Sequence, residues 1–281
     1  MDVYYKDDYI NEKKPVLLFI HGGAFFFGDK EDKLQRELTD NALKQGFVVV
    51  SVNYRLGSML LGTGCIEKTI YCGVQDVRSA LRYITHHCDD FRIDPDRIFI
   101  AGSSSGAFIA LTTAFMEEHE IYKSCHKKSF RKRFGNLDNS GNDLDCPFKI
   151  AGVISLWGGI PNLDIISEHE KIPVLLFHGT EDNIILQDHG IPFQGQIPPV
   201  LRSTFLRKWN IYGSHAIYEH ITKNNIPAQI IYFEGNGHEP YLEKDGSFND
   251  NLDVIKEKIN DFLLMNTTGQ FINDLAYRKD I

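Results

Sequence analysis

The sequence predicts an α/β fold in which helices cover both faces of a mostly parallel β-sheet. Six short runs rich in apolar and β-branched residues recur along the 281 residues without polar alternation, which is typical of strands buried on both faces of a parallel sheet. Helical patterns lie between most of these runs, so right-handed crossovers are expected. We expect a single domain over residues 1–281, with strands at residues 16–20, 47–52, 97–101, 150–156, 173–178 and 229–233.

The helices are predicted by apolar residues spaced three or four positions apart. Leu34, Leu38 and Ala42 form such a stripe, which stops at Gly46, a residue type that commonly follows a helix C-terminus. A helix-compatible stretch follows the third strand. The further patterns are Val74, Val77, Leu81 and Ile84; residues 107–111; Ala216, Ile217, His220 and Ile221; and Leu252, Ile255, Ile259, Phe262 and Leu263.

One segment, residues 117–149, interrupts this alternation. It is polar, carries a basic run at residues 127–133, and is rich in Asn, Asp and Gly from residue 135 to residue 145. A basic run in an acidic protein is most often the solvated end of a helix. The alternative is an insertion beside the functional site, acting as a lid or a docking surface.

Composition and charge exclude several functional classes. The chain has 30 Lys and Arg against 38 Asp and Glu, a formal net charge of −8, which argues against a surface that neutralises nucleic-acid phosphates. No apolar run approaches the roughly 20 residues that a transmembrane helix needs. We therefore expect neither a nucleic-acid partner nor a membrane span. No secretory leader opens the sequence, which leaves a cytoplasmic and an exported location both open; the oligomeric state is open as well.

Neither a metal nor another cofactor is expected. The five cysteines form no C-x-x-C pair, and a bridge between Cys125 and Cys146 would require an exported protein. The run at residues 86–90, with two His, one Cys and two Asp, superficially resembles a set of metal ligands. Adjacent residues at a helix end point in different directions, and no H-E-x-x-H pattern occurs, so we do not assign a metal site there.

The third predicted strand runs directly into Gly102-Ser103-Ser104-Ser105-Gly106, and a helix-compatible stretch follows. This is a G-x-S-x-G pattern between a strand and a helix, the setting in which the pattern marks a nucleophile elbow. The turn holds the central serine in a strained backbone conformation, and the flanking glycines let the strand and the helix approach closely. Ser104 is therefore the candidate nucleophile.

A second glycine segment, His21-Gly22-Gly23-Ala24, follows the first predicted strand. Acyl transfer places negative charge on a carbonyl oxygen, and backbone N–H groups reach that oxygen only where no bulky side chain intervenes. We assign this oxyanion hole to the N–H groups of Gly23, Ala24 and Ser105, with Gly22 as the alternative for one of them. For His21 we expect a hydrogen bond that fixes the loop, not the role of a catalytic base.

A serine nucleophile needs a general base, and the base needs a carboxylate that orients it. His238 is the candidate base because it follows the last predicted strand in a glycine-rich loop, and sites in α/β sheets gather beyond the carboxyl ends of strands. Asp182 follows the fifth strand in the same way, with Glu181 and Asp188 as competing carboxylates. The chain order Ser104, Asp182, His238 is the order of an α/β-hydrolase.

These features together resemble the α/β-hydrolase superfamily, and within it carboxylesterases and acetyl-esterases with an H-G-G-x oxyanion motif. The likeness extends from about residue 3 to residue 265. Members usually have two antiparallel strands before the one that leads to the oxyanion loop, whereas only residues 2–5 are available here, so we expect a shortened N-terminal edge. Further similar segments are Val52-Asn53-Tyr54-Arg55-Leu56, Asp94-Pro95-Asp96-Arg97-Ile98, His178-Gly179-Thr180-Glu181-Asp182, Tyr212-Gly213-Ser214 and Gly235-Asn236-Gly237-His238-Glu239.

The function implied by this resemblance is cofactor-free hydrolysis of a carboxylic ester of a small molecule, through an acyl-enzyme on Ser104. The implied substrates carry short acyl groups, or acetyl or feruloyl groups on a sugar or an aromatic alcohol. Phe25, Tyr54 and Trp157 lie at or just beyond strand ends and are the candidate walls of the substrate pocket. Two alternatives remain: a serine peptidase or amidase with the same triad, and a catalytically silent binding module on the same fold.

Overall fold

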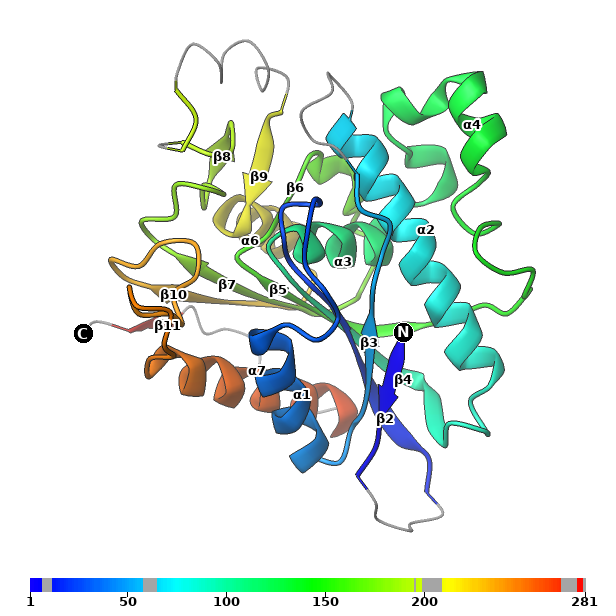
Figure 1. Cartoon of the computed structure of the whole chain (residues 1–281), viewed down its shortest axis with the longest axis horizontal. Coiled ribbons are helices and arrows are strands. Elements are labelled where there is room, and N and C mark those ends of the chain that lie inside the picture. The colour runs from blue at the N-terminus through cyan, green and yellow to red at the C-terminus, as the bar shows by residue number, and fades with distance from the viewer. Residues whose placement is uncertain (7–11, 58–64, 195, 199–208, 269–276, 280–281) are drawn as a thin grey trace.

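A computed structural model describes residues 1–6, 12–57, 65–194, 196–198, 209–268 and 277–279 (Figure 1). Its centre is an eight-stranded sheet in the order β1-β3-β2-β4-β5-β7-β10-β11. Every pairing in it is parallel except that of β1 with β3, so the mostly parallel sheet expected from the sequence is confirmed. The strands are β1 (Asp2–Tyr4), β2 (Lys14–Ile20), β3 (Val48–Val52), β4 (Ile93–Ser103), β5 (Ile150–Leu156), β7 (Val174–Gly179), β10 (Ala228–Phe233) and β11 (Tyr277–Lys279).

Helices cover both faces of this sheet, as Figure 1 shows. One face packs against α1 (Lys33–Lys44) and α7 (Asn251–Thr268), and the other against α2 (Cys65–His86), α3 (Ser105–Phe115) and α6 (Ser214–Lys223). Side chains along each strand alternate between the two cores: in β2, Leu17 and Phe19 pack toward α1, and Leu18 and Ile20 pack toward α2 and α3. All five helices match helical patterns in the sequence.

Helix α1 illustrates how local sequence sets an element. The side chain of Asp32 accepts a hydrogen bond from the N–H of Gln35 and caps the N-terminus. Leu38 and its stripe neighbours are buried against the sheet, a burial worth roughly 1.5–3 kcal/mol for each large aliphatic side chain. Gly46, with φ +84°, follows the C-terminus in the left-handed region, as the sequence predicts.

Short elements complete the fold. A second, three-stranded sheet of β6 (Gly159–Ile160), β9 (Ile211–Gly213) and β8 (His189–Gly190) is antiparallel. Its strands are too short to show a pattern in the sequence, and it was not predicted. A 3₁₀ turn, η3 (Leu163–Ile165), follows β6. Within the described residues, no helix is long and apolar enough to cross a membrane.

The segment 117–149 contains two 3₁₀ turns and one short helix, and Figure 1 shows it beside α2. Gln75 of α2 donates from Nε2 to the carbonyls of Phe134 and Asn136 and thereby holds the segment in place. Most of the basic run is exposed on α4, in agreement with a solvated helix. Cys125 and Cys146 are both free thiols, so the bridge considered for them is not formed. The elements are η1 (Glu118–Glu120), η2 (Lys123–His126) and α4 (Lys128–Phe134).

Candidate active site

Ser104 stands in the sharp turn between β4 and α3, with φ 50° and ψ −118°. The flanking glycines are required sterically. A Cβ atom on Gly102 would lie 2.3 Å from the backbone of Gly106, and one on Gly106 would lie 2.2 Å from the carbonyl oxygen of Ile20. The strained serine backbone is therefore held by close packing of β2, β4 and α3, the setting of a nucleophile elbow.

Three side chains from three strand ends form one hydrogen-bonded chain. Nε2 of His238 lies 2.8 Å from Oγ of Ser104, and Nδ1 of His238 lies 2.7 Å from Oδ2 of Asp182. Ser104 follows β4, Asp182 follows β7 and His238 follows β10, all at the carboxyl ends of parallel strands in one sheet, in which β5 separates β4 from β7. The competing carboxylates lie elsewhere: Glu181 is exposed, and Asp188 is exposed and faces His215 at 3.8 Å.

Asp182 is buried and held from both oxygens. Its Oδ1 accepts the N–H groups of Ile184 at 2.8 Å and Ile185 at 2.9 Å, while Oδ2 faces His238. Burial alone would raise the pKa of this carboxyl, but hydrogen bonds from His178 and His238 outweigh it and hold the pKa of Asp182 below its ordinary value. The carboxylate is therefore charged wherever the imidazole of His238 can act as a base.

A second histidine, His178, contacts the same carboxylate and was not recognised from the sequence. It is fully buried, with Nε2 2.8 Å from the carbonyl oxygen of Ile185 and 3.3 Å from Oδ2 of Asp182. Both neighbours of Nε2 are acceptors, so this nitrogen carries a proton. Nδ1 lies 2.8 Å from Oγ of Ser214. The sequence signals were the position of His178 at the end of an apolar strand and its place in the segment from His178 to Asp182 that resembles the family; neither assigned it a role.

The loop after β2 places backbone N–H groups beside the nucleophile. A Cβ atom on Gly22 would lie 3.5 Å from Cβ of Ser104, so the loop runs directly alongside the elbow. Within the described residues, the N–H groups of Gly23 and Ala24 donate to no backbone or side-chain acceptor. Ser105 is the first residue of α3, where an N–H has no partner inside the helix. These three N–H groups are free to meet a developing oxyanion.

His21 and Tyr54 lie beneath this loop. Nδ1 of His21 donates to the carbonyl of Gly22 at 2.7 Å, which matches the loop-fixing role expected for His21. Burial lowers the pKa of His21, so its ring is neutral. The expectation for Tyr54 needs correction: it does not line the substrate cavity but is buried, with its hydroxyl directed at the backbone of His21 and at Ser105.

A cavity of about 540 Å³ opens onto Ser104 and His238. The candidate wall residues Phe25 and Trp157 are part of its lining, and Tyr241, which also lines it, stacks on Trp157 with ring centroids 5.1 Å apart. No lining residue comes from the segment 117–149. Other residues of the lining are Phe108, Ile184, Ile185 and Ile211, with Asp32, Lys33 and Glu239 as its charged members.

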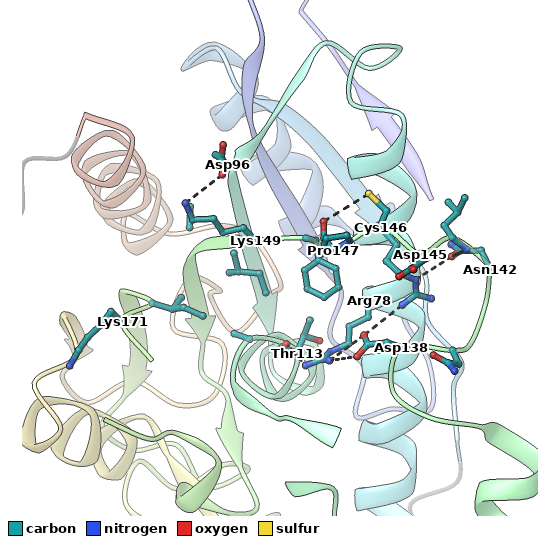
Figure 2. A pocket seen from close by; sticks show the side chains of 18 of the residues that line it. Arg78, Asp96, Thr113, Asp138, Asn142, Asp145, Cys146, Pro147, Lys149 and Lys171 are labelled. Atoms are coloured by element: carbon teal, nitrogen blue, oxygen red, sulfur yellow. Dashed lines mark hydrogen bonds and ion pairs between the residues drawn. The ribbon is translucent and has the colours of Figure 1, made fainter. Parts of the chain in front are cut away.

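A second, more polar pocket of about 1140 Å³ lies between α2, α3 and residues 138–149 (Figure 2). Ile150 and Pro173 line it at the amino ends of β5 and β7, away from the ends that carry Ser104 and Asp182. Its charges largely pair with one another: Arg78 donates to both carboxylate oxygens of Asp138. Hydrogen bonds at this pocket hold residues 138–142 against α2.

Parts of this chain are similar in sequence to other proteins. It is 34% identical over 122 residues to the non-reducing polyketide synthase pkbA of Emericella nidulans, covering 41% of the chain and 4% of that protein. It is 33% identical over 153 residues to Gut esterase 1 of Caenorhabditis briggsae, covering 53% of the chain and 27% of that protein. The matched stretch thus spans less than a third of the length of either curated relative.

The fold has a solved counterpart in esterase 2 of Thermogutta terrifontis with propionate bound. The TM-score is 0.66 at 18% identity, and the match covers 97% of this chain and 90% of that one. This likeness supports the α/β-hydrolase fold that the motifs imply. The sequence profile of the BD-FAE family matches residues 1–170, more than half of the 281 residues, and the chain therefore belongs to the BD-FAE family.

Proposed function

We propose that the protein is a serine esterase that hydrolyses carboxylic esters of small molecules. The observation that carries this proposal is the hydrogen-bonded chain from Ser104 through His238 to Asp182, with links of 2.8 and 2.7 Å. It opens onto a cavity beside three unpaired N–H groups, which is the arrangement that acyl transfer requires. Membership of the BD-FAE family and the similarity to a gut esterase support the same activity.

The proposed reaction has two halves. In the first, Oγ of Ser104 attacks the ester carbonyl while Nε2 of His238 takes its proton, and the carboxylate of Asp182 stabilises the resulting imidazolium. The N–H groups of Gly23, Ala24 and Ser105 bind the oxyanion. His238 then gives the proton to the leaving alcohol, and an acyl-enzyme remains. In the second half, water activated by His238 attacks the acyl-enzyme and releases the acid.

The cavity lining supports substrates with a compact acyl group or an aromatic part. Phe25, Trp157 and Tyr241 present flat apolar surfaces close to the nucleophile, and the cavity of about 540 Å³ is of the size that binds small molecules. The specific proposal is an acetyl or feruloyl ester of a sugar or an aromatic alcohol.

A serine peptidase or amidase is the second candidate, because one observation favours it. The carboxylates of Asp32 and Glu239 belong to the cavity lining, and a carboxylate is the natural partner of a substrate amine. However, Asp32 already caps α1 by accepting the N–H of Gln35, and Glu239 accepts the hydroxyl of Tyr241 at 3.2 Å. Ester hydrolysis is therefore the preferred proposal.

A panel of p-nitrophenyl esters of increasing acyl length, with methyl ferulate and alanine p-nitroanilide, tests both functions. We expect the wild type to hydrolyse esters, and Ser104→Ala to lose essentially all turnover. Ser124→Ala, in the distant turn η2, is the matched control and should keep full activity. A fluorophosphonate probe should label Ser104. Labelling of a different residue, or equal ester turnover by wild type and Ser104→Ala, would contradict the proposal and leave a silent binding module as the better description.

A further inference from the structure

The proposed oxyanion donors come from two segments that are far apart in the sequence. The N–H groups of Gly23 and Ala24 belong to the loop after β2, whereas that of Ser105 opens α3. Donors stabilise an oxyanion fully only when they are already aimed at its position before the reaction. Something must therefore fix the loop relative to the start of α3.

We propose that Tyr54 is a positioning residue that ties the two halves of the oxyanion hole together through its hydroxyl group. This inference rests on the proposed esterase function. The Tyr54 hydroxyl lies 3.2 Å from the carbonyl oxygen of His21 and 3.1 Å from Oγ of Ser105. Within the described residues, no other side chain is hydrogen-bonded to both segments.

The direction of these bonds follows from the groups involved. A phenol carries one proton, and the carbonyl of His21 is an acceptor only, so Tyr54 donates to His21. The hydroxyl of Ser105 then donates to the oxygen of Tyr54. Burial raises the pKa of Tyr54 to about 12, so the phenol stays protonated across the pH range of an esterase assay. The link is therefore present whenever the enzyme works.

The aromatic ring of Tyr54 supports the same loop. It stacks on the imidazole of His21 with ring centroids 4.5 Å apart and an interplanar angle of 20°. His21 in turn donates from Nδ1 to the carbonyl of Gly22, one residue before the first proposed donor. Tyr54 is only 6% exposed and does not line the cavity, so it acts on the reaction through the backbone and not through the substrate.

The test is Tyr54→Phe, which keeps the stacked ring and removes only the hydroxyl. Because oxyanion contacts strengthen in the transition state, we expect kcat to fall about tenfold with KM nearly unchanged. Affinity for a trifluoromethyl ketone, which mimics the tetrahedral intermediate, should fall by a similar factor, while affinity for the acid product should not. Rates are divided by the concentration of active sites, titrated with a fluorophosphonate, so loss of folded protein does not imitate the effect.

Tyr122→Phe is the matched control. Tyr122 is also 6% exposed, and its hydroxyl lies 3.4 Å from Oγ1 of Thr112, away from the cavity lining. We expect a comparable change in Tm for both variants and a change in kcat only for Tyr54→Phe. Ser105→Ala keeps the N–H of Ser105 but removes its bond to Tyr54, so the double variant should be little worse than Tyr54→Phe alone.

The inference is overturned if Tyr54→Phe keeps the wild-type kcat and ketone affinity per active site, whatever its Tm, because Tyr54 would then be only structural. It is equally overturned if KM rises and kcat does not change. Those outcomes leave the esterase function intact, since the wild type still turns over. A wild type without ester turnover would remove both proposals together.

Discussion

Nε2 of His178 lies 3.3 Å from Oδ2 of Asp182, the same oxygen that receives Nδ1 of His238 at 2.7 Å. One carboxylate oxygen therefore contacts two imidazoles. His178 is fully buried at the end of β7 and is fixed by the carbonyl of Ile185 and the hydroxyl of Ser214. A carboxylate held in this way cannot rotate away from the proposed base without breaking several buried hydrogen bonds.

Replacement of His178 should therefore weaken catalysis without touching the substrate. We expect His178→Ala to lower kcat more than His178→Gln, because the glutamine amide can replace the Nε2–H donor. His178→Ala should also lose stability, since each buried polar partner left without a bond costs about 1–3 kcal/mol. His220→Ala removes a similar bond, to the carbonyl of Ile166 at 2.8 Å, outside the site. Equal kcat for all three variants, measured per titrated active site, would contradict this role.

Asp182 and Asp188 offer a direct test of the proposed triad. Asp182→Asn keeps the shape but removes the charge that selects the correct tautomer of His238, so kcat should fall on the order of 10⁴-fold. Asp188→Asn should leave kcat unchanged, because Asp188 is exposed and faces His215 at 3.8 Å. Both are measured with one p-nitrophenyl ester at saturation. A large loss in Asp188→Asn would identify a different carboxylate.

The sequence predicted the parts of the site that depend on local pattern. Ser104, Asp182 and His238 each follow an apolar strand, and the carboxyl ends of parallel strands meet at one edge, so their proximity could be inferred from position along the chain. The role of Tyr54 could not be inferred in this way. It depends on contacts with His21 and Ser105, which lie 33 and 51 positions away in the sequence. The strand β11 was missed for a different reason: its three residues are too few to show periodicity.

The thiol groups of Cys125 and Cys146 should differ in reactivity. Cys125 is fully buried, and burial raises the pKa of its thiol to about 12, whereas Cys146 is partly exposed. Because the thiolate is the reactive form, iodoacetamide at pH 8 should modify Cys146 and spare Cys125 in the native protein. After unfolding without a reductant, both should be modified, as mass spectrometry of tryptic peptides will show. Protection of both after unfolding would indicate a disulfide.

The thiol of Cys125 also makes the stability of the folded protein depend on pH. The raised pKa of Cys125 in the folded state means that the unfolded chain releases this proton first as pH rises. Ionisation therefore favours unfolding above about pH 9, the ordinary pKa of a cysteine, and the stability contributed below that pH is lost as pH approaches 12. Cys125→Ala should lower stability at neutral pH but flatten this alkaline decline, which urea unfolding at pH 7 and pH 10 can measure.

Alanine substitutions at Gly23 and Gly46 distinguish the effect of backbone strain from the effect of losing the oxyanion hole. Both have positive φ, +111° and +84°, so a replacement by alanine strains the backbone at either position, at a cost of roughly 1–2 kcal/mol. A Cβ atom on Gly46 meets nothing within 4 Å, whereas one on Gly23 would lie 1.9 Å from the carbonyl oxygen of Phe27. Gly46→Ala should therefore lower Tm and leave kcat unchanged.

The clash in Gly23→Ala must instead displace the loop. The turn cannot relax locally, because the carbonyl of Gly23 accepts the N–H groups of Phe26 and Phe27 at 2.9 and 3.1 Å. The proposed donors at Gly23 and Ala24 move with it. Since removal of one oxyanion donor costs about 10²–10³ in kcat, a loss of at least that size is expected, with affinity for a trifluoromethyl ketone reduced in parallel. A Gly23→Ala variant that loses only Tm, as Gly46→Ala does, would show that this loop does not bind the oxyanion.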